Sequence, residues 1–220
     1  MAKMPKNAIL ATDEDFSIMT SIGAIILAAG SGSRMGRAKQ LFRIDGQSLV
    51  RRAARAALDG GCGRVVVVTG AHADVVGPEL ADLPVTVSFN SAWSGGMGTS
   101  IRCGLAALLG SDPGISAAVI LLCDQPRLSG DVVRNVVAAW SGSGKPMAAC
   151  DYGGAIGPPC CFGRAMFDAL GRIGDADGAK RLLLAGRGNV QSIAWPAGSD
   201  DLDTPDDWHR LCQTDSRPAQ

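Results

Sequence analysis

Continuous apolar runs alternate with amphipathic stretches over most of this chain. The runs at 24–29 (AIILAA), 65–68 (VVVV) and 117–122 (AAVILL) contain no polar residue, which is typical of strands covered on both faces of a parallel sheet. The segment 85–89 (VTVSF) alternates between apolar and polar residues instead. It therefore predicts a half-exposed strand near an edge of the sheet.

Helices are predicted between these strands. Ser48 stands where an N-cap is expected, and residues 49–58 then place leucine, valine and alanine on one face and three arginines opposite. Further helical patterns lie at 99–109, 130–140, 165–170, 179–185 and 205–211. The glycine-rich stretch 141–145 (SGSGK) is expected to be a short loop. This alternation indicates an α/β class, layered around a mainly parallel sheet.

Length and composition limit the possible classes of protein. The 220 residues, 46% of them apolar, fit a single domain at 21–220 preceded by a flexible leader at 1–20. The 21 basic and 21 acidic residues balance, so no global field would attract nucleic acid or a membrane surface. The longest apolar run, 117–123, is too short to span a bilayer.

Cysteine usage indicates a reducing compartment. The seven cysteines form no C-x-x-C pair, and their odd number argues against a framework of disulfides. We expect free thiols and therefore a cytoplasmic protein. The adjacent Cys160 and Cys161 should point to opposite faces of a strand, with at least one of them in the core. Neither histidine gives a cue for pairing with a catalytic thiol.

A glycine-rich basic loop follows the first predicted strand, in the stretch ILAAGSGSRMGRAKQL (26–41). Ligands of open parallel sheets bind beyond the carboxyl ends of the strands. Glycines there let backbone N–H groups approach an anion, and Lys39 and Arg34 supply a point charge and a planar fork for phosphate oxygens. The G-x-G-x-x-x-G spacing fits neither the dinucleotide fingerprint nor the P-loop. The alternative is a solvated basic loop without a ligand.

A carboxylate stands after another predicted strand, where Asp124 follows AAVILL in the sequence C-D-Q-P. Carboxylate and phosphate oxygens are natural ligands of Mg²⁺, so Asp124 is a candidate metal ligand in the crevice where phosphates would bind. The alternative is a turn or capping aspartate before Pro126. Downstream, DDLDTPDDW (200–208) contains five aspartates, most of which are explained by a helix start at Thr204 and Pro205.

The stretch from Leu27 to Lys39, L-A-A-G-x-G-S-R-M-G-x-x-K, resembles the signature of the MobA/MocA-like molybdopterin nucleotidyltransferases. It is most similar to the cytidylyltransferase (MocA-like) branch, and the similarity extends from residue 23 to about 212. This resemblance implies a three-layer α/β/α fold of the nucleotide-diphospho-sugar transferase (Rossmann-like) type. It also implies that the loop ending at Lys39 surrounds the triphosphate of CTP.

The resemblance also assigns roles to individual residues. Lys39, Arg34 and Asp124 would be catalytic, and Asp124 and Asp203 would hold Mg²⁺. The implied nucleotide-binding residues are Leu27, Ala28, Ala29, Gly30, Ser33, Arg34, Lys39, Gly96, Ser100 and Asp124. Gly96 would approach the base through its backbone and Ser100 through its hydroxyl, although residues 90–105 could also form a simple flexible turn.

On the acceptor side, the resemblance implies Tyr152, Gly157 and Pro159. One departure from the family pattern lies nearby. The family commonly has G-D-x-G-A-R, whereas this chain reads GDADGAK (174–180), with one additional residue and a lysine in place of arginine. This difference weakens any assignment of Asp175, Asp177 and Lys180 to the phosphate of the pterin.

Together with these features, the resemblance implies a Mg²⁺-dependent transfer of CMP from CTP to the phosphate of molybdopterin, with release of pyrophosphate. A molybdoenzyme apoprotein is a further candidate partner. Cytosine is favoured because Ala29 stands where the guanylyl branch commonly has glycine. The alternatives are a molybdopterin guanylyltransferase, another cytidylyl- or sugar-phosphate nucleotidyltransferase, or a non-catalytic factor that binds and delivers the finished cofactor.

Overall fold

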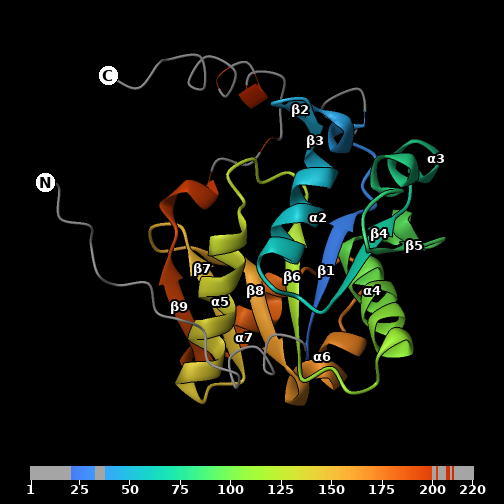
Figure 1. Cartoon of the computed structure of the whole chain (residues 1–220). Helices are drawn as coiled ribbons and strands as arrows, with labels where there is room; N and C mark the ends of the chain where they lie inside the picture. The colour runs from blue at the N-terminus through green and yellow to red at the C-terminus, as the bar shows by residue number, and fades with distance from the viewer. Residues whose placement is uncertain (1–20, 33–37, 200–201, 203–206, 209, 211–220) are drawn as a thin grey trace, which may run out of the picture.

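The computed structural model describes residues 21–32, 38–199, 202, 207–208 and 210 (Figure 1). The predicted leader at 1–20 and the site candidates Ser33, Arg34 and Asp203 lie outside the described residues, as does part of the helix predicted at 205–211. The division into a leader and one domain therefore stays a prediction.

Seven strands form one sheet in the order β5-β4-β1-β6-β8-β7-β9 (Figure 1). In chain order they are β1 (Ile22–Ala28), β4 (Arg64–Thr69), β5 (Thr86–Phe89), β6 (Ala117–Leu122), β7 (Met147–Asp151), β8 (Ile156–Gly163) and β9 (Val190–Ala194). Among the described strands of this sheet, β8 alone runs antiparallel to its neighbours. The sheet is therefore mainly parallel, as predicted. A separate two-stranded hairpin consists of β2 (Arg43–Ile44) and β3 (Gln47–Ser48).

The three uniformly apolar runs form the middle of the sheet. β1 lies between β4 and β6, so that Leu27 stands opposite Val68 on one side and Leu122 on the other. All seven residues of β1 are buried, because helices cover both faces of the sheet at this point. β5 lies at the edge, as its alternating pattern predicted, and its Val87 and Phe89 side chains are 43% and 59% exposed.

Helices pack on both faces and complete three layers (Figure 1). α2 (Leu49–Asp59) and α5 (Gly130–Ser143) contribute to one buried apolar cluster, and α4 (Met97–Ser111), α6 (Phe167–Gly171) and α7 (Ala179–Ala185) contribute to the other. The predicted α/β/α architecture is confirmed. Among the described residues, no helix is long and apolar enough to cross a membrane.

The ends of two helices show where sequence patterns were accurate and where they were not. Ser48 caps α2 as predicted, since its hydroxyl accepts the backbone N–H of Arg51 at 3.4 Å. The expectation of a loop at 141–145 was wrong, because α5 continues to Ser143. The Ser141 and Ser143 hydroxyls donate to carbonyls one turn earlier, at 3.2 and 3.1 Å. The helix ends only at Gly144, whose φ of 66° is left-handed.

Cys160 and Cys161 lie in the middle of β8 and face opposite sides of the sheet, as predicted. Each is fully buried, and each belongs to a different one of the two apolar clusters. Burial raises the pKa of both thiols well above the ordinary value. Both cysteines are therefore core residues.

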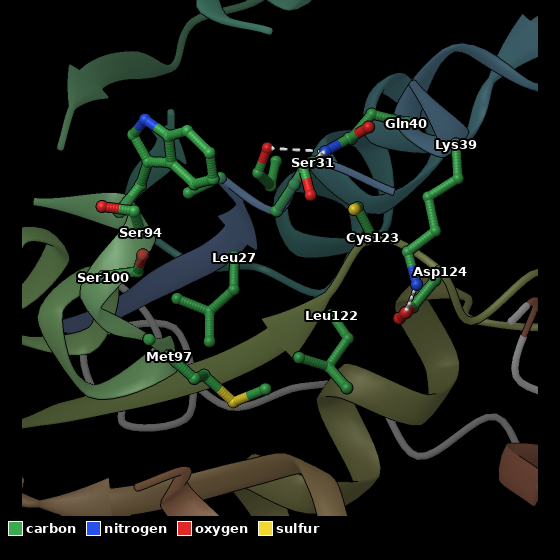
Figure 2. A pocket seen from close by; sticks show the side chains of 15 residues that line it. Leu27, Ser31, Lys39, Gln40, Ser94, Met97, Ser100, Leu122, Cys123 and Asp124 are labelled. Atoms are coloured by element: carbon green, nitrogen blue, oxygen red, sulfur yellow. Dashed lines mark hydrogen bonds and ion pairs between the residues drawn. The ribbon is translucent and has the colours of Figure 1, made fainter. Parts of the chain in front are cut away.

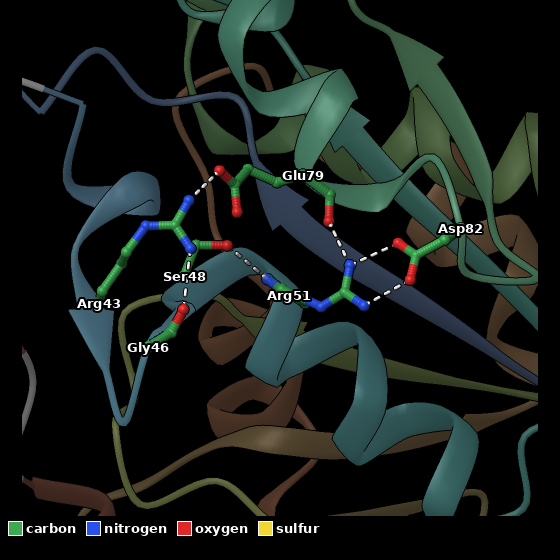
Figure 3. A network of polar contacts seen from close by, with 6 residues as sticks. All are labelled: Arg43, Gly46, Ser48, Arg51, Glu79 and Asp82. Atoms are coloured by element: carbon green, nitrogen blue, oxygen red, sulfur yellow. Dashed lines mark hydrogen bonds and ion pairs between the residues drawn. The ribbon is translucent and has the colours of Figure 1, made fainter.

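An ion-pair network joins the hairpin and α2 to the 3-10 helix η3 (Gly77–Leu80), which follows α3 (Ala73–Val76), and to Asp82 just beyond η3 (Figure 3). The guanidinium of Arg51 donates to both carboxylate oxygens of Asp82 at 2.6 Å and to the Glu79 carbonyl at 2.9 Å. Arg43 pairs with the Glu79 carboxylate and donates to the Gly46 carbonyl at 2.9 Å. The network holds the start of α2 in place, and the hairpin connects α2 to the segment that contains Lys39.

Candidate active site

A pocket of about 360 Å³ opens at the carboxyl ends of β1 and β6 (Figure 2). After β1 the chain adds β4 and β5 on one side of β1, and then places β6 on its other side. The order in which strands are added to the sheet therefore reverses between β1 and β6. Open α/β sheets bind ligands at such switch points. The lining residues are Leu27, Ala28, Ala29, Gly30, Ser31, Lys39, Gln40, Trp93, Ser94, Gly96, Met97, Ser100, Leu122, Cys123 and Asp124.

Lys39 and Asp124 form an ion pair at one end of this pocket (Figure 2). Lys39 begins a single-turn 3-10 helix, η2 (Lys39–Leu41), and Asp124 follows the end of β6. Both side chains are mostly shielded from water, with exposed fractions of 17% and 16%. The pairing brings together two residues that are 85 positions apart in the sequence.

Asp124 retains one unused oxygen. Lys39 contacts Oδ2, whereas Oδ1 is buried and has no hydrogen-bond partner among the described residues. A buried carboxylate oxygen without a partner is unfavourable, and a cation or ligand donor would satisfy it. This oxygen fits the chemistry of a hard divalent cation. The described residues hold no cluster of three or more His, Cys, Asp or Glu side chains that could bind a metal by themselves.

The second predicted metal ligand, Asp203, lies outside the described residues. Its neighbour Leu202 is described, and the backbone N–H of Leu202 donates to the Asp124 carbonyl at 3.2 Å. The backbone of Leu202 therefore lies directly beside Asp124.

The opposite end of the pocket is formed by the start of α4. The Asn90 side-chain nitrogen donates to Thr99 Oγ1 at 2.8 Å and to Ser100 Oγ at 3.0 Å, while its oxygen accepts the Ala92 N–H at 3.0 Å. Because Ser100 Oγ accepts this bond, the Ser100 hydroxyl can direct its own proton to a ligand. Asn90 itself was not predicted to be a site residue, although it is the first residue of the segment 90–105, which was predicted to lie beside the base.

Gly96 lines the pocket as expected, but a neighbouring loop explains why glycine is required there. Its φ is 124°, and a Cβ atom would lie 2.5 Å from the Asp175 carbonyl oxygen. The Gly98 N–H donates to the same carbonyl at 2.9 Å. Arg102 of α4 holds this loop by donating to the Ile173 carbonyl and pairing with the Asp175 carboxylate. The loop at 174–176 therefore packs directly on the start of α4.

The structure shows how the charged residues of GDADGAK are used. Asp175 pairs with Arg102, Asp177 pairs with Arg181, and the Lys180 side chain is exposed to solvent. The two carboxylates are thus used to hold the loop and α7 in place. None of the three residues lines the pocket.

The predicted acceptor residues lie beyond Asp124, at the junction of β7 and β8. The Tyr152 ring lies against Gly157, where a Cβ would approach the ring to 3.1 Å. Pro159 is buried within β8. Gln125, which follows Asp124, donates to the Pro158 carbonyl at 3.0 Å and the Tyr152 hydroxyl at 3.3 Å. These residues adjoin the pocket through Gln125 but do not line it.

Two buried glutamines were missed by the sequence reasoning. Gln40 follows Lys39 and Gln125 follows Asp124, so each member of the ion pair is followed by a buried amide. The available signal was a polar residue directly after a charged one, beside an apolar run. Cys123 also lines the pocket, but burial and the adjacent Asp124 raise its pKa to about 12. Its thiol stays protonated and is no nucleophile.

The structure thus brings together eight of the ten residues predicted to bind nucleotide. Leu27, Ala28, Ala29, Gly30, Lys39, Gly96, Ser100 and Asp124 all line the pocket, and the other two, Ser33 and Arg34, lie outside the described residues. The apolar side chains of Leu27, Met97 and Leu122 surround its centre (Figure 2).

One protein family matches most of the chain. Residues 24–190 match the family model described as the MobA-like NTP transferase domain. The purine catabolism protein PucB of Bacillus subtilis is 30% identical, and the match covers 84% of this chain and 92% of PucB. The nicotine blue oxidoreductase of Paenarthrobacter nicotinovorans is 37% identical, but the match covers 58% of this chain and only 59% of that relative.

A solved structure is also similar to this chain over most of its length. Rv0371c from Mycobacterium tuberculosis superposes with a TM-score of 0.74 at 26% identity, over 87% of this chain and 97% of that one. A complex of Rv0371c with manganese superposes with a TM-score of 0.70.

Proposed function

Because the chain belongs to the MobA-like NTP transferase family, and is therefore a nucleotidyltransferase, we propose that it transfers CMP from CTP to the phosphate of molybdopterin. An oxygen of the acceptor phosphate attacks the α-phosphorus of CTP. The bond from that phosphorus to the bridging oxygen breaks, and pyrophosphate leaves with the electron pair. The observation that carries the proposal is the Lys39–Asp124 ion pair at the switch-point pocket, with one Asp124 oxygen unsatisfied.

Lys39 binds the triphosphate in this proposal. Its ammonium group has three N–H donors, so it can keep its contact with Asp124 while donating to phosphate oxygens. Arg34 would add a bidentate contact from the same loop. Positioning and charge neutralisation are the main requirements for such a transfer, and no covalent intermediate with the protein is needed.

Asp124 and Asp203 would hold Mg²⁺ in this site. When bound, the ion would neutralise phosphate charge and lower the cost of bringing two anions together. The unsatisfied Asp124 oxygen and the position of Leu202 beside Asp124 support this assignment, as does the manganese complex of Rv0371c for a divalent ion in general.

The base and the acceptor would enter from different sides. Leu27, Met97 and Leu122 offer apolar contacts to the base and ribose, and Ser100 offers a hydroxyl to the edge of the base. The acceptor would approach from Tyr152 and Gly157, next to Asp124. The cysteine usage favours a cytoplasmic location, where a molybdoenzyme apoprotein would receive the product.

The test combines binding and turnover. Purified protein is heated with CTP, GTP, ATP or UTP, each with Mg²⁺, Mn²⁺ or EDTA. We expect CTP with a divalent ion to raise the melting temperature most, since ligand binding stabilises the folded state by mass action. Pyrophosphate release on addition of molybdopterin should follow. Binding without release would indicate a cofactor-delivery factor, and selective use of GTP would indicate a guanylyltransferase.

A further inference from the structure

We propose that Gln40 is a positioning residue for the nucleotide, and that its amide fixes the backbone at the end of β1 in the conformation that binds phosphate. This inference rests on the proposed nucleotidyl transfer. Gln40 would act on the backbone that binds the nucleotide and would take no part in the bond-forming or bond-breaking steps.

The Gln40 amide makes two hydrogen bonds to one short stretch of backbone. Its nitrogen donates to the Ala28 carbonyl at 3.0 Å and to the Gly30 carbonyl at 2.6 Å. Two carbonyl acceptors around one amide atom establish that this atom is the nitrogen, and they use both of its hydrogens. The side chain is 1% exposed, so water does not compete for these bonds.

The Gln40 amide holds the Gly30 carbonyl itself, whereas the flanking Ala29 and Ser31 carbonyls bond to the Ala71 N–H and the His72 ring. A Cβ atom at Gly30 would meet no atom within 4 Å, so side-chain packing does not hold this residue. In a trans peptide the N–H points opposite to the carbonyl. By holding the Gly30 carbonyl, Gln40 therefore also directs the Ser31 N–H away from itself. Backbone N–H groups in a glycine loop are the donors that bind phosphate.

Gln40 also fixes the starting point of the Lys39 side chain. The two residues are adjacent in η2, and their side chains leave in different directions, Gln40 toward the Ala28 and Gly30 carbonyls and Lys39 toward Asp124 (Figure 2). Once the Gln40 amide is bonded to the end of β1, the η2 backbone has a fixed position relative to that strand. The ammonium of Lys39 is then held beside Asp124.

Gln125 provides a matched control. It is also buried, at 5% exposure, and its nitrogen also donates to backbone carbonyl groups. Its partners, however, lie on the acceptor side of Asp124, at Pro158 and Gly198. Replacing each glutamine by methionine removes the same amide with little change in volume and no change in charge.

The experiment measures dissociation constants for CTP with Mg²⁺ by isothermal titration calorimetry. Wild type, Gln40→Met and Gln125→Met are compared, with urea unfolding of each. Losing the two hydrogen bonds that hold the backbone at Ala28 and Gly30 should raise the Gln40→Met constant by at least about tenfold, while Gln125→Met stays within about twofold of wild type. Gln40→Asn, which keeps the amide but is one methylene too short to reach both carbonyls, should also weaken binding and serves if Gln40→Met does not fold.

Two outcomes would overturn the inference. The first is a Gln40 variant that folds, is less stable and binds CTP like wild type, because Gln40 would then only stabilise the fold. The second is an equal loss of affinity in both methionine variants, because the effect would then not be specific to the β1 end. If wild type binds none of CTP, GTP, ATP and UTP, the proposed function itself fails.

Discussion

Lys39 and Asp124 each serve two purposes at the centre of the pocket. Lys39 neutralises a carboxylate and faces the space where phosphates would bind, and Asp124 holds that lysine while keeping one oxygen unsatisfied. Removing either charge therefore breaks this ion pair in a largely shielded position. Single substitutions at these two residues are the sharpest tests of the proposed chemistry.

Asp124→Asn should reduce the rate of pyrophosphate release about 10²–10³-fold, as is typical when one electrostatic contact of a reaction centre is lost. The amide keeps the shape of the side chain but loses its negative charge. Circular dichroism should show an unchanged fold. Asp168→Asn, at an exposed residue of α6, is the control for loss of one charge. Normal turnover of Asp124→Asn at saturating Mg²⁺ would contradict the assignment.

Lys39→Ala should weaken both nucleotide binding and turnover, because the triphosphate loses its point charge. Lys39→Arg should restore activity only in part, since a planar fork does not reproduce the geometry of an ammonium group. Steady-state kinetics with varied CTP separates the effect on KM from that on kcat. Unchanged values for Lys39→Ala would show that the loop does not bind the phosphates.

Ala29 should contribute to the choice of base. It is buried, lines the pocket and follows directly on β1. In the proposed CTP site its methyl group would fill space that a purine needs, and a difference of this size is worth about 1–3 kcal/mol, or about 10–200-fold. We expect wild type to prefer CTP over GTP in kcat/KM, and Ala29→Gly to narrow that preference without reversing it. Equal use of both nucleotides by wild type in a competition assay would refute this.

Among helices and strands, predictability followed the strength of the local pattern. The predicted bounds of β1, β4 and β6 differ from the observed bounds by at most two residues. These strands were predictable because their runs are uniformly apolar, a consequence of burial on both faces. β9 was missed because its five residues mix buried and exposed positions. The hairpin β2–β3 was also missed, because strands of two residues carry no periodicity.

The candidate site was predictable where its residues lie next to these strand ends. Asp124 follows β6, and Ala29 follows β1. Contacts between distant segments could not be found this way. The bonds of Gln40 to the β1 end, and the loop at 174–176 on α4, depend on how the layers pack.

The contact between α4 and that loop makes a prediction about Gly98. A Cβ at Gly98 would overlap the Gly174 carbonyl oxygen, which is backbone and cannot rotate away. Gly98→Ala should lower the free energy of unfolding by about 1–3 kcal/mol and weaken CTP binding, because Gly96 and Met97 line the pocket. Gly110→Ala, near the end of the same helix and with open space around it, should be neutral or stabilise by up to about 1 kcal/mol. Urea unfolding and CTP titration of both variants provide the comparison.

Across the whole molecule, acid should weaken the attachment of α2 to the segment after η3. The Arg51 guanidinium, through its paired hydrogen bonds, lowers the pKa of Asp82 from 3.8 to about 2. Because the folded pKa is the lower one, this carboxylate stabilises the fold above about pH 4, and the contribution is lost as the pH falls toward 2. The free energy of unfolding of wild type should therefore fall more steeply over this range than that of Asp82→Asn. Parallel curves would contradict the role given to the Arg51–Asp82 pair.

The reversed direction of β8 has a consequence for how this protein can evolve. β7 ends and β8 begins at the same edge of the sheet, so Tyr152 and Gly157 come from one short continuous stretch of chain. The residues that line the pocket proposed for the nucleotide come from the ends of β1 and β6 and from the start of α4, which are far apart in the gene. If the proposed acceptor and nucleotide sites are correct, one insertion or recombination between codons 152 and 159 would change the acceptor, whereas a new base would require changes in three separate segments of the gene. Lineages with this architecture should diversify faster in acceptor than in nucleotide.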